Sequence, residues 1–326
     1  MKPGNHIEVE VVALDSKGDG LALVGEREVL VRGAVPGDRV AVRLIKKRKG
    51  RFEAVIEEYR EMGYERQEPL CTHFGHCGGC RWQELAYDDQ LKVKQQMIAD
   101  ALALSGLEIP ILEPIIASPT PYFYRNKMEF TFSNNRWVLH GEPEDVERDF
   151  ALGMHIPKRW DKILNIDECH IQPQLGNEII NKARSLAKEL KLKPYDQKTH
   201  NGFLRYLLMR FGQNTGDILL NLVTSYENAD LLQPMVNGLI EAFPQITTIV
   251  NNINTRKADV AFGEYELHLH GKPALEERIG DLTFEISANS FFQTNTGMAE
   301  KLYETALEGA ELSGEEVVFD LYCGTG

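Results

Sequence analysis

The sequence contains no long hydrophobic run. No stretch approaches the roughly 18 uninterrupted apolar residues that a membrane helix requires. The first residues, MKPGNHIEVEVV, also lack the apolar segment of a signal peptide. These two absences predict a cytoplasmic protein that has no membrane partner.

Cysteine is scarce, with five residues in a chain of 326. In the reducing cytoplasm, thiols do not normally pair as disulfides. Three of the five lie within ten residues, in CTHFGHCGGC at positions 71–80. Such clustering indicates metal binding rather than a disulfide framework.

Positive charge is also in deficit, because 36 Lys and Arg stand against 49 Asp and Glu, for a net charge of -13. This balance argues against nucleic acid overall, although the local distribution of charge matters more. The stretch RLIKKRKGR carries six basic residues out of nine and forms either a solvated turn or a phosphate-contacting patch. Its basic members are Arg43, Lys46, Lys47, Arg48, Lys49 and Arg51.

Residues 5–60 predict a small β-barrel. The run HIEVEVVAL alternates apolar and polar residues, and further Val-rich and Ile-rich runs follow between the turn signals KGDG and VPGD. Several short strands in about 60 residues suggest a barrel such as the OB-fold, which commonly binds oligonucleotides.

The rest of the chain predicts a mixture of helices and strands. A helix is expected within 84–106, and RYLLMRFG and DILLNLVTS suggest a hairpin around QNTG. A helix over 296–310, capped by Thr296, precedes a buried strand in EEVVFDL. That strand runs into DLYCGTG, which is typical of the first turn of a nucleotide-binding α/β fold.

We therefore expect a mixed multidomain protein. Its parts are an OB-like barrel over 1–62, an α+β central domain over 63–290, and the start of a Rossmann-like α/β domain over 291–326. The helix within 84–106 is expected to pack on this last α/β domain. One strand cannot form a doubly wound sheet, so most of the last domain is expected to lie outside the sequence.

The clustered cysteines predict a thiolate metal site. Cys71, Cys77 and Cys80 give the spacing C-x5-C-x2-C, and the next cysteine is Cys169. Four thiolates suit either zinc or an iron–sulfur cluster. Paired zinc knuckles usually show two C-x2-C pairs, and this sequence has one. Three clustered cysteine ligands with a distant fourth favour a [4Fe-4S] cluster. Gly78 and Gly79 allow the backbone to point N–H groups at sulfur.

The order of these features resembles that of the bacterial RNA (uracil-5-)-methyltransferases, specifically the 23S ribosomal RNA branch with a TRAM domain and an iron–sulfur cluster. The resemblance spans nearly the whole chain. Its motifs, in chain order, are CGGC, YRNKMEF, FLRYLLMR, NSFFQTN and FDLYCGTG.

The resemblance implies two groups of site residues. A [4Fe-4S] cluster would be bound by Cys71, Cys77, Cys80 and Cys169. S-adenosylmethionine would be bound by Gln293 and Tyr322 and, in a class I fold, by the turn residues Asp320, Gly324 and Gly326. The family's catalytic cysteine and general base match no residue of this sequence, which implies a chain that is truncated at its first cofactor motif and inactive alone.

The implied reaction is methylation of uridine C5 in 23S ribosomal RNA by a monomeric enzyme. A cysteine thiolate would add to C6, so that C5 becomes nucleophilic, and the uridine would have to leave its stack. Basic and aromatic residues of the central domain would join the basic run in contacting RNA. These candidates are Tyr124, Arg125, Lys127, Arg205 and Arg210.

Two other functions remain open from the sequence. The first is a non-catalytic RNA-binding module. The second is an iron–sulfur DNA glycosylase, although such enzymes are mostly helical and this chain is rich in predicted strands.

Overall fold

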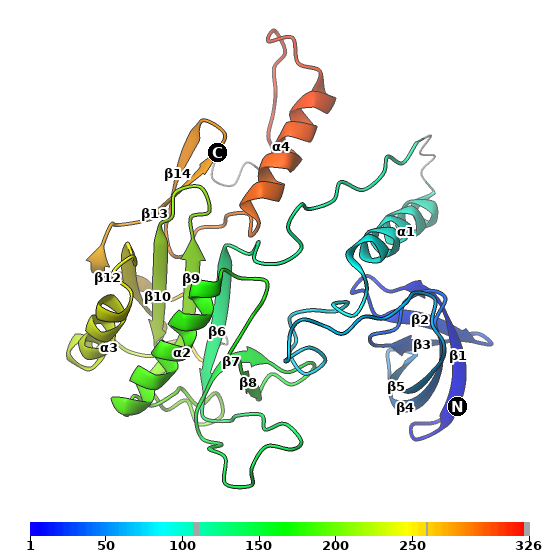
Figure 1. Ribbon diagram of the computed structural model, residues 1–326, viewed down its shortest axis with the longest axis horizontal. Helices are drawn as coiled ribbons and strands as arrows, with labels where there is room; N and C mark the ends of the chain where they lie inside the picture. The colour runs from blue at the N-terminus through cyan, green and yellow to red at the C-terminus, as the bar shows by residue number, and fades with distance from the viewer. Residues whose placement is uncertain (107–110, 259, 323–326) are drawn as a thin grey trace. The chain divides into compact units, whose positions relative to one another are not determined.

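The computed structural model describes residues 1–106, 111–258 and 260–322 (Figure 1). The chain divides into two compact units. The first unit comprises Met1–Gly75 and Cys80–Pro119, and the second comprises His76–Gly79 and Thr120–Gly326. The domain boundaries expected at 62 and 290 stay predictions. No helix in the described ranges combines the length and the apolar character that crossing a membrane requires.

The first unit contains the small barrel that the sequence predicts. Its strands are β1 His6–Leu14, β2 Gly20–Val24, β3 Arg27–Val31, β4 Arg39–Arg48 and β5 Arg51–Glu61. They close in the order β1-β2-β3-β5-β4, with β3 and β5 parallel. The alternation in β1 turns Val9 and Val11 into the core and leaves Glu8 and Glu10 in solvent.

One helix, α1 Tyr87–Ser105, completes the first unit. It ends where expected, because Gly106 takes the left-handed conformation (φ 71°) that a glycine adopts without strain. Only Val93 of this helix is buried, in a small cluster with Val35 and Leu85. Packing of this helix on a catalytic domain stays a prediction.

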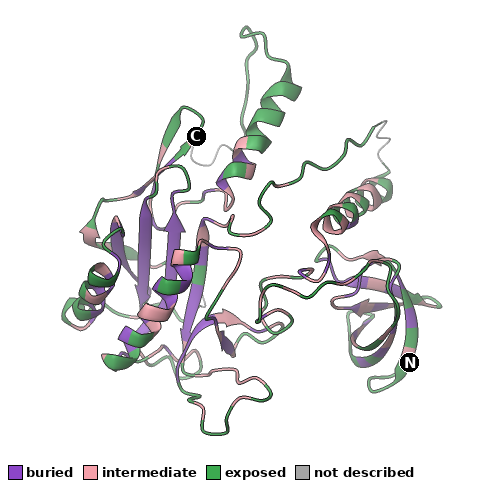
Figure 2. Ribbon diagram, in the orientation of Figure 1, coloured by how far each residue is buried: buried purple, intermediate pink, exposed green. Residues whose placement is uncertain are grey.

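The second unit is built on a seven-stranded sheet. Its order is β12-β11-β10-β9-β6-β7-β8, and of these pairs only β10 and β11 run parallel. The strands in chain order are β6 Lys127–Ser133, β7 Ala151–His155, β8 Ile163–Asn165, β9 Leu204–Phe211, β10 Ile218–Thr224, β11 Thr248–Ile253 and β12 Tyr265–Gly271. The strands β9, β10 and β11 are buried along their whole length (Figure 2).

Both faces of this sheet are covered. The helices α2 Gln174–Glu189 and α3 Ala229–Ala242 pack their apolar faces on the side to which Leu220 and Leu222 point. The hairpin of β13 Leu275–Ile279 and β14 Leu282–Ile286 covers the opposite side, where Leu219 contacts Leu275 and Ile286 in one cluster. The hairpin of β9 and β10 around QNTG is present as predicted.

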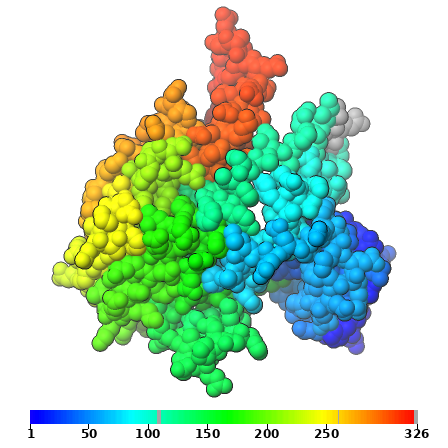
Figure 3. Space-filling view, viewed as in Figure 1, coloured from blue at the N-terminus to red at the C-terminus, as the bar shows by residue number. Residues whose placement is uncertain are grey.

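The last helix, α4 Thr296–Ala310, matches its predicted range, but the strand predicted in EEVVFDL is wrong. These residues form no strand, and the exposed fractions of Val317 and Phe319 are both 80%. A strand needs a hydrogen-bonded neighbour for its backbone groups, and no described strand pairs with this segment. Helix α4 projects from the body of the second unit (Figure 3).

Candidate functional site

The segment 290–296, which contains the SFFQTN motif, is held by the side chain of Asn126. This residue lies just before β6 and is 5% exposed. Its backbone N–H donates to the carbonyl of Thr294 at 2.9 Å. Its amide nitrogen donates to the carbonyl of Gln293 at 2.8 Å and to the hydroxyl of Thr296 at 2.9 Å. One side chain therefore fixes the backbone around Gln293.

A buried carboxylate continues this network. The Thr296 hydroxyl donates to Glu277 at 2.8 Å, and Glu277 is only 1% exposed. The same carboxylate accepts the backbone N–H groups of Gln213 at 2.8 Å and of Asn214 at 3.0 Å. The start of α4 is thus tied to the β9–β10 turn. Thr296 is not the helix cap that the sequence predicted, because Asn295 accepts the N–H of Met298 at 3.1 Å.

Arg210 of β9 also holds this segment through hydrogen bonds to its backbone. Its guanidinium donates to the carbonyl of Ala288 at 3.3 Å and to the carbonyl of Ser290. Burial lowers the pKa of Arg210 to about 10, so the group is still charged at neutral pH. Lys127 lies opposite Arg210 in the sheet. Burial lowers the pKa of Lys127, and the charge of Arg210 lowers it further.

Three predicted cofactor residues line one cavity of about 880 Å³. They are Gln293, Asp320 and Tyr322. The wall also includes aromatic rings of Phe284, Phe291, Phe292 and Tyr303, and the acidic side chains of Glu300 and Glu304. Gly324 and Gly326, predicted to belong to the same site, lie outside the described residues.

Two of the predicted cluster cysteines belong to the second unit. Cys77 and Cys169 are half-buried and pack at the edge of the same hydrophobic core. The N–H of Gly79 donates to the sulfur of Cys77 at 3.3 Å. Gly78 must be glycine, because a Cβ there would lie 2.8 Å from the carbonyl oxygen of His155.

Cys71 and Cys80 belong to the first unit. The N–H of Cys71 donates to the side chain of Gln83 at 3.2 Å. Within residues 1–106, 111–258 and 260–322, no group of three or more Cys, His, Asp or Glu side chains forms a metal site. The iron–sulfur cluster therefore stays a prediction.

The basic run forms the end of the β4–β5 hairpin, and several of its charges are paired. Arg43 lies 3.3 Å from Glu57, Lys46 lies 3.5 Å from Glu53, and Arg51 pairs with Glu28. Lys47 lies over the ring of Phe52, 5.6 Å from its centre. In the described part of the chain, Arg48 and Lys49 have no ion pair. These two residues are therefore the cations most available to a phosphate.

The predicted RNA contacts of the central domain include residues with structural roles. Arg205 is 2% exposed and donates to the carbonyls of Asn254, Arg256 and Ala258 at 2.6–2.8 Å. Its guanidinium also lies 4.4 Å from the ring centre of Tyr195. Arg125 donates to the carbonyl of Lys127 at 2.9 Å. Contact of these residues with RNA stays a prediction.

Sequence reasoning missed Asn126 and Glu277 as determinants of the site. Asn126 lies in the motif YRNKMEF, in which its basic neighbours Arg125 and Lys127 were predicted to be functional and Asn126 was not. Glu277 lies in the stretch GKPALEER, which carries two acidic and two basic residues, and nothing in that stretch distinguishes it from Glu276.

Similar sequences are named as RNA methyltransferases. An uncharacterized RNA methyltransferase of Chlorobaculum tepidum is 41% identical over 305 residues, which cover 91% of this chain and 63% of the relative. Another, of Porphyromonas gingivalis, is 36% identical over 331 residues, covering 98% of this chain and 70% of the relative. The chain thus spans less than two thirds of the Chlorobaculum protein. No family model matches the chain.

A solved structure supports the same assignment. The crystal structure of Pyrococcus abyssi tRNA (uracil-54, C5)-methyltransferase in complex with S-adenosyl-L-homocysteine matches with a TM-score of 0.67 and 27% sequence identity. The match covers 92% of this chain and 64% of that protein. With the Porphyromonas relative 36% identical and 70% covered, this chain belongs to the family of RNA methyltransferases.

Proposed function

We propose that this chain provides cofactor binding and RNA binding to an enzyme that transfers a methyl group from S-adenosylmethionine to C5 of a uridine in 23S ribosomal RNA. The observation that carries the proposal is the cavity shared by Gln293, Asp320 and Tyr322. These are cofactor residues of the resembled family, and two of them lie more than 25 positions from the third. Membership of the RNA methyltransferase family supports the reaction class, and the Pyrococcus neighbour supports the cofactor and the uridine carbon.

The cavity has the chemistry that S-adenosylmethionine needs. The cofactor would supply a methyl group on a positively charged sulfur. Gln293 and Tyr322 would supply polar contacts, the rings of Phe284 and Phe291 an apolar surface, and Glu300 and Glu304 a field that favours a cation. Asn126 and Arg210 would hold the Gln293 segment in place while the cofactor binds.

The uridine would be activated by covalent addition. A thiolate that adds to C6 makes C5 nucleophilic, and loss of the C5 proton followed by β-elimination restores the ring. The resemblance assigns this thiolate to no residue of the 326. The residues of this chain would bind the cofactor and the RNA.

We propose further that Cys71, Cys77, Cys80 and Cys169 hold a [4Fe-4S] cluster. The surroundings of Cys77 and Cys169 fit such a group. The Gly79 N–H already points at the Cys77 sulfur, and N–H bonds of this kind stabilise and tune cluster thiolates. The N–H of Cys169 is fixed by the side chain of Asn177 at 2.8 Å, which anchors the distant ligand to α2.

Protein purified without air is expected to carry about four irons per chain and to absorb broadly near 400 nm. Cys169→Ser is expected to lower the iron content and the thermal stability of the second unit, because the distant ligand is lost. Cys323→Ser serves as the matched control and should leave the iron content unchanged. Stoichiometric zinc without iron in anaerobic protein would contradict the cluster.

The proposed reaction is tested in cells of the source organism. Deletion of the whole coding region is expected to remove a 5-methyluridine from 23S ribosomal RNA, detected by mass spectrometry of the nucleosides. Re-expression of the unsubstituted protein from the deleted coding region should restore the 5-methyluridine. Re-expression of its Gln293→Ala variant should not. An unchanged content of 5-methyluridine in all RNA after the deletion would refute the proposal.

A transfer RNA substrate is the second candidate, because the matching Pyrococcus structure is a tRNA methyltransferase. In the same experiment, loss of 5-methyluridine from transfer RNA with ribosomal RNA unchanged would favour this candidate.

A further inference from the structure

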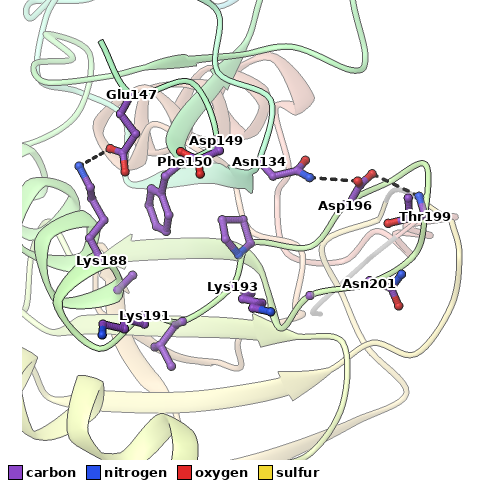
Figure 4. A pocket seen from close by; sticks show the side chains of 14 residues that line it. Asn134, Glu147, Asp149, Phe150, Lys188, Lys191, Lys193, Asp196, Thr199 and Asn201 are labelled. Carbon is purple, nitrogen blue, oxygen red and sulfur yellow. Dashed lines mark hydrogen bonds and ion pairs between the residues drawn. The ribbon is translucent and has the colours of Figure 1, made fainter. Parts of the chain in front are cut away.

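Two adjoining hollows lie on the second unit, away from the cofactor cavity. The larger, of about 560 Å³, is bordered by residues at the end of α2 and the chain that follows it (Figure 4). The smaller, of about 230 Å³, lies between the end of β6 and the segment 196–198. Asn134 and Asp196 line both, so the two hollows adjoin, and together they are called the depression below.

An exposed tryptophan borders the smaller hollow. Trp160 lines it and is 59% exposed. Exposed aromatic rings are the surfaces on which proteins stack unpaired bases, so a tryptophan beside a hollow is a candidate for such a contact. The amide side chains of Asn134, Asn135 and Gln197 line the same hollow. A flat ring beside several amides matches how proteins stack and read an unpaired base.

The carboxylates of the smaller hollow are already engaged. Asp161 accepts from Arg159 at 3.0 and 3.3 Å, and this pairing holds the pKa of Asp161 below its usual value. Asp196 accepts from Asn134 at 3.0 Å and from the backbone N–H groups of Lys198 and Thr199. Both acids organise the walls. The charge of Asp161 is offset by Arg159, whereas Asp196 has neutral donors as its partners.

Lysines border the larger hollow. Lys188 pairs with Glu147, as Figure 4 shows. Lys191 and Lys193 also line this hollow and form no ion pair with any described residue. The depression thus offers a stacking ring at one end and unpaired cations at the other, in a chain of net charge -13.

We propose that this depression binds an unpaired stretch of the substrate RNA outside the cofactor site. One base stacks on Trp160, and neighbouring phosphates lie near Lys191 and Lys193. The ligand class is a single-stranded ribonucleotide segment, because every base has a face to stack and the walls carry both donors and acceptors. The inference rests on the proposed function, since it takes RNA as the substrate.

The experiment measures binding of deproteinised ribosomal RNA and of a short oligouridine to the protein and its variants. Trp160→Ala is expected to weaken binding by about 5- to 100-fold, the usual range for loss of one stacked base. Trp160→Phe keeps an aromatic face and should restore most of the affinity. Phe262→Ala removes a comparably exposed ring that lines neither hollow, and should bind like the parent.

Tryptophan fluorescence gives a second readout that a structural role would not move. Oligouridine should quench the parent protein, and Trp160→Phe should lose most of that quenching while Trp82 and Trp137 remain. The inference is overturned if the parent binds RNA and Trp160→Ala binds equally well, a result that leaves the proposed function intact. If the parent binds no RNA, both the inference and the proposed substrate fail.

Discussion

Glu277→Ala is expected to lower the free energy of unfolding of the second unit by about 3 to 5 kcal/mol. The carboxylate accepts from the N–H groups of Gln213, Asn214 and Arg278 and from the hydroxyl of Thr296. Alanine would leave these four donors without their acceptor at a site that is 1% exposed. Each buried donor left unsatisfied costs about 1 to 3 kcal/mol, and water reaching the turn reduces the total.

The measurement is urea unfolding followed by the fluorescence of Trp137 and Trp160, which both belong to the second unit. The neighbouring Glu276 provides a matched control, because its side chain is 46% exposed and pairs with Lys272 at 3.0 Å. Glu276→Ala should cost less than about 1 kcal/mol, as is usual for an exposed ion pair. Equal losses in the two variants would show that Glu277 is not the centre of the network.

The same substitution should also disturb the proposed cofactor site. Glu277 holds Thr296, and Thr296 is held in turn by Asn126, which binds the carbonyl of Gln293. Two distant residues therefore position the proposed cofactor motif. Asn126 lies 167 positions from Gln293, and Glu277 lies 19 positions from Thr296. The proposed cofactor motif would therefore depend on the fold of the second unit.

Elements whose structure depends on local pattern could be predicted from the sequence. The barrel follows from the alternation of β1 and its glycine turns, and the β9–β10 hairpin follows from two apolar runs around QNTG. The helix over Thr296–Ala310 was predicted to the residue. In each case neighbouring residues supply the signal, because the partner strand or the cap lies close in the sequence.

Elements that depend on distant partners could not be predicted. The run EEVVFDL has the composition of a buried strand, yet composition does not provide the neighbouring strand that it needs. Arg205 and Glu277 carry charges that normally indicate the surface, and only the fold shows that backbone groups from distant segments satisfy them. The shared cavity of Gln293 and Tyr322 could be expected only from the resemblance.

Replacing Lys46, Lys47, Arg48 and Lys49 by glutamine is expected to weaken RNA binding and to flatten its salt dependence. Each lost phosphate contact lowers the log–log slope by about 0.7 to 0.9. The quadruple variant should therefore lose about 1.4 to 1.8 if only Arg48 and Lys49 contact phosphates, and about 2.8 to 3.6 if all four do. The measurement is the affinity for ribosomal RNA over a series of salt concentrations.

The ion pairs of the hairpin favour the smaller value. Lys46 is paired with Glu53 and Lys47 lies over the ring of Phe52, whereas Arg48 and Lys49 have neither kind of partner among the described residues. The double variant Arg48→Gln/Lys49→Gln should then reproduce most of the effect of the quadruple variant. Arg43→Gln/Arg51→Gln removes the same charge from residues that Glu57 and Glu28 already neutralise, and should change the slope by less than half as much. Equal slopes for the two double variants would mean that RNA binding depends only on the total charge of the barrel. A quadruple variant that binds like the parent at every salt concentration would mean that RNA binds elsewhere on the protein.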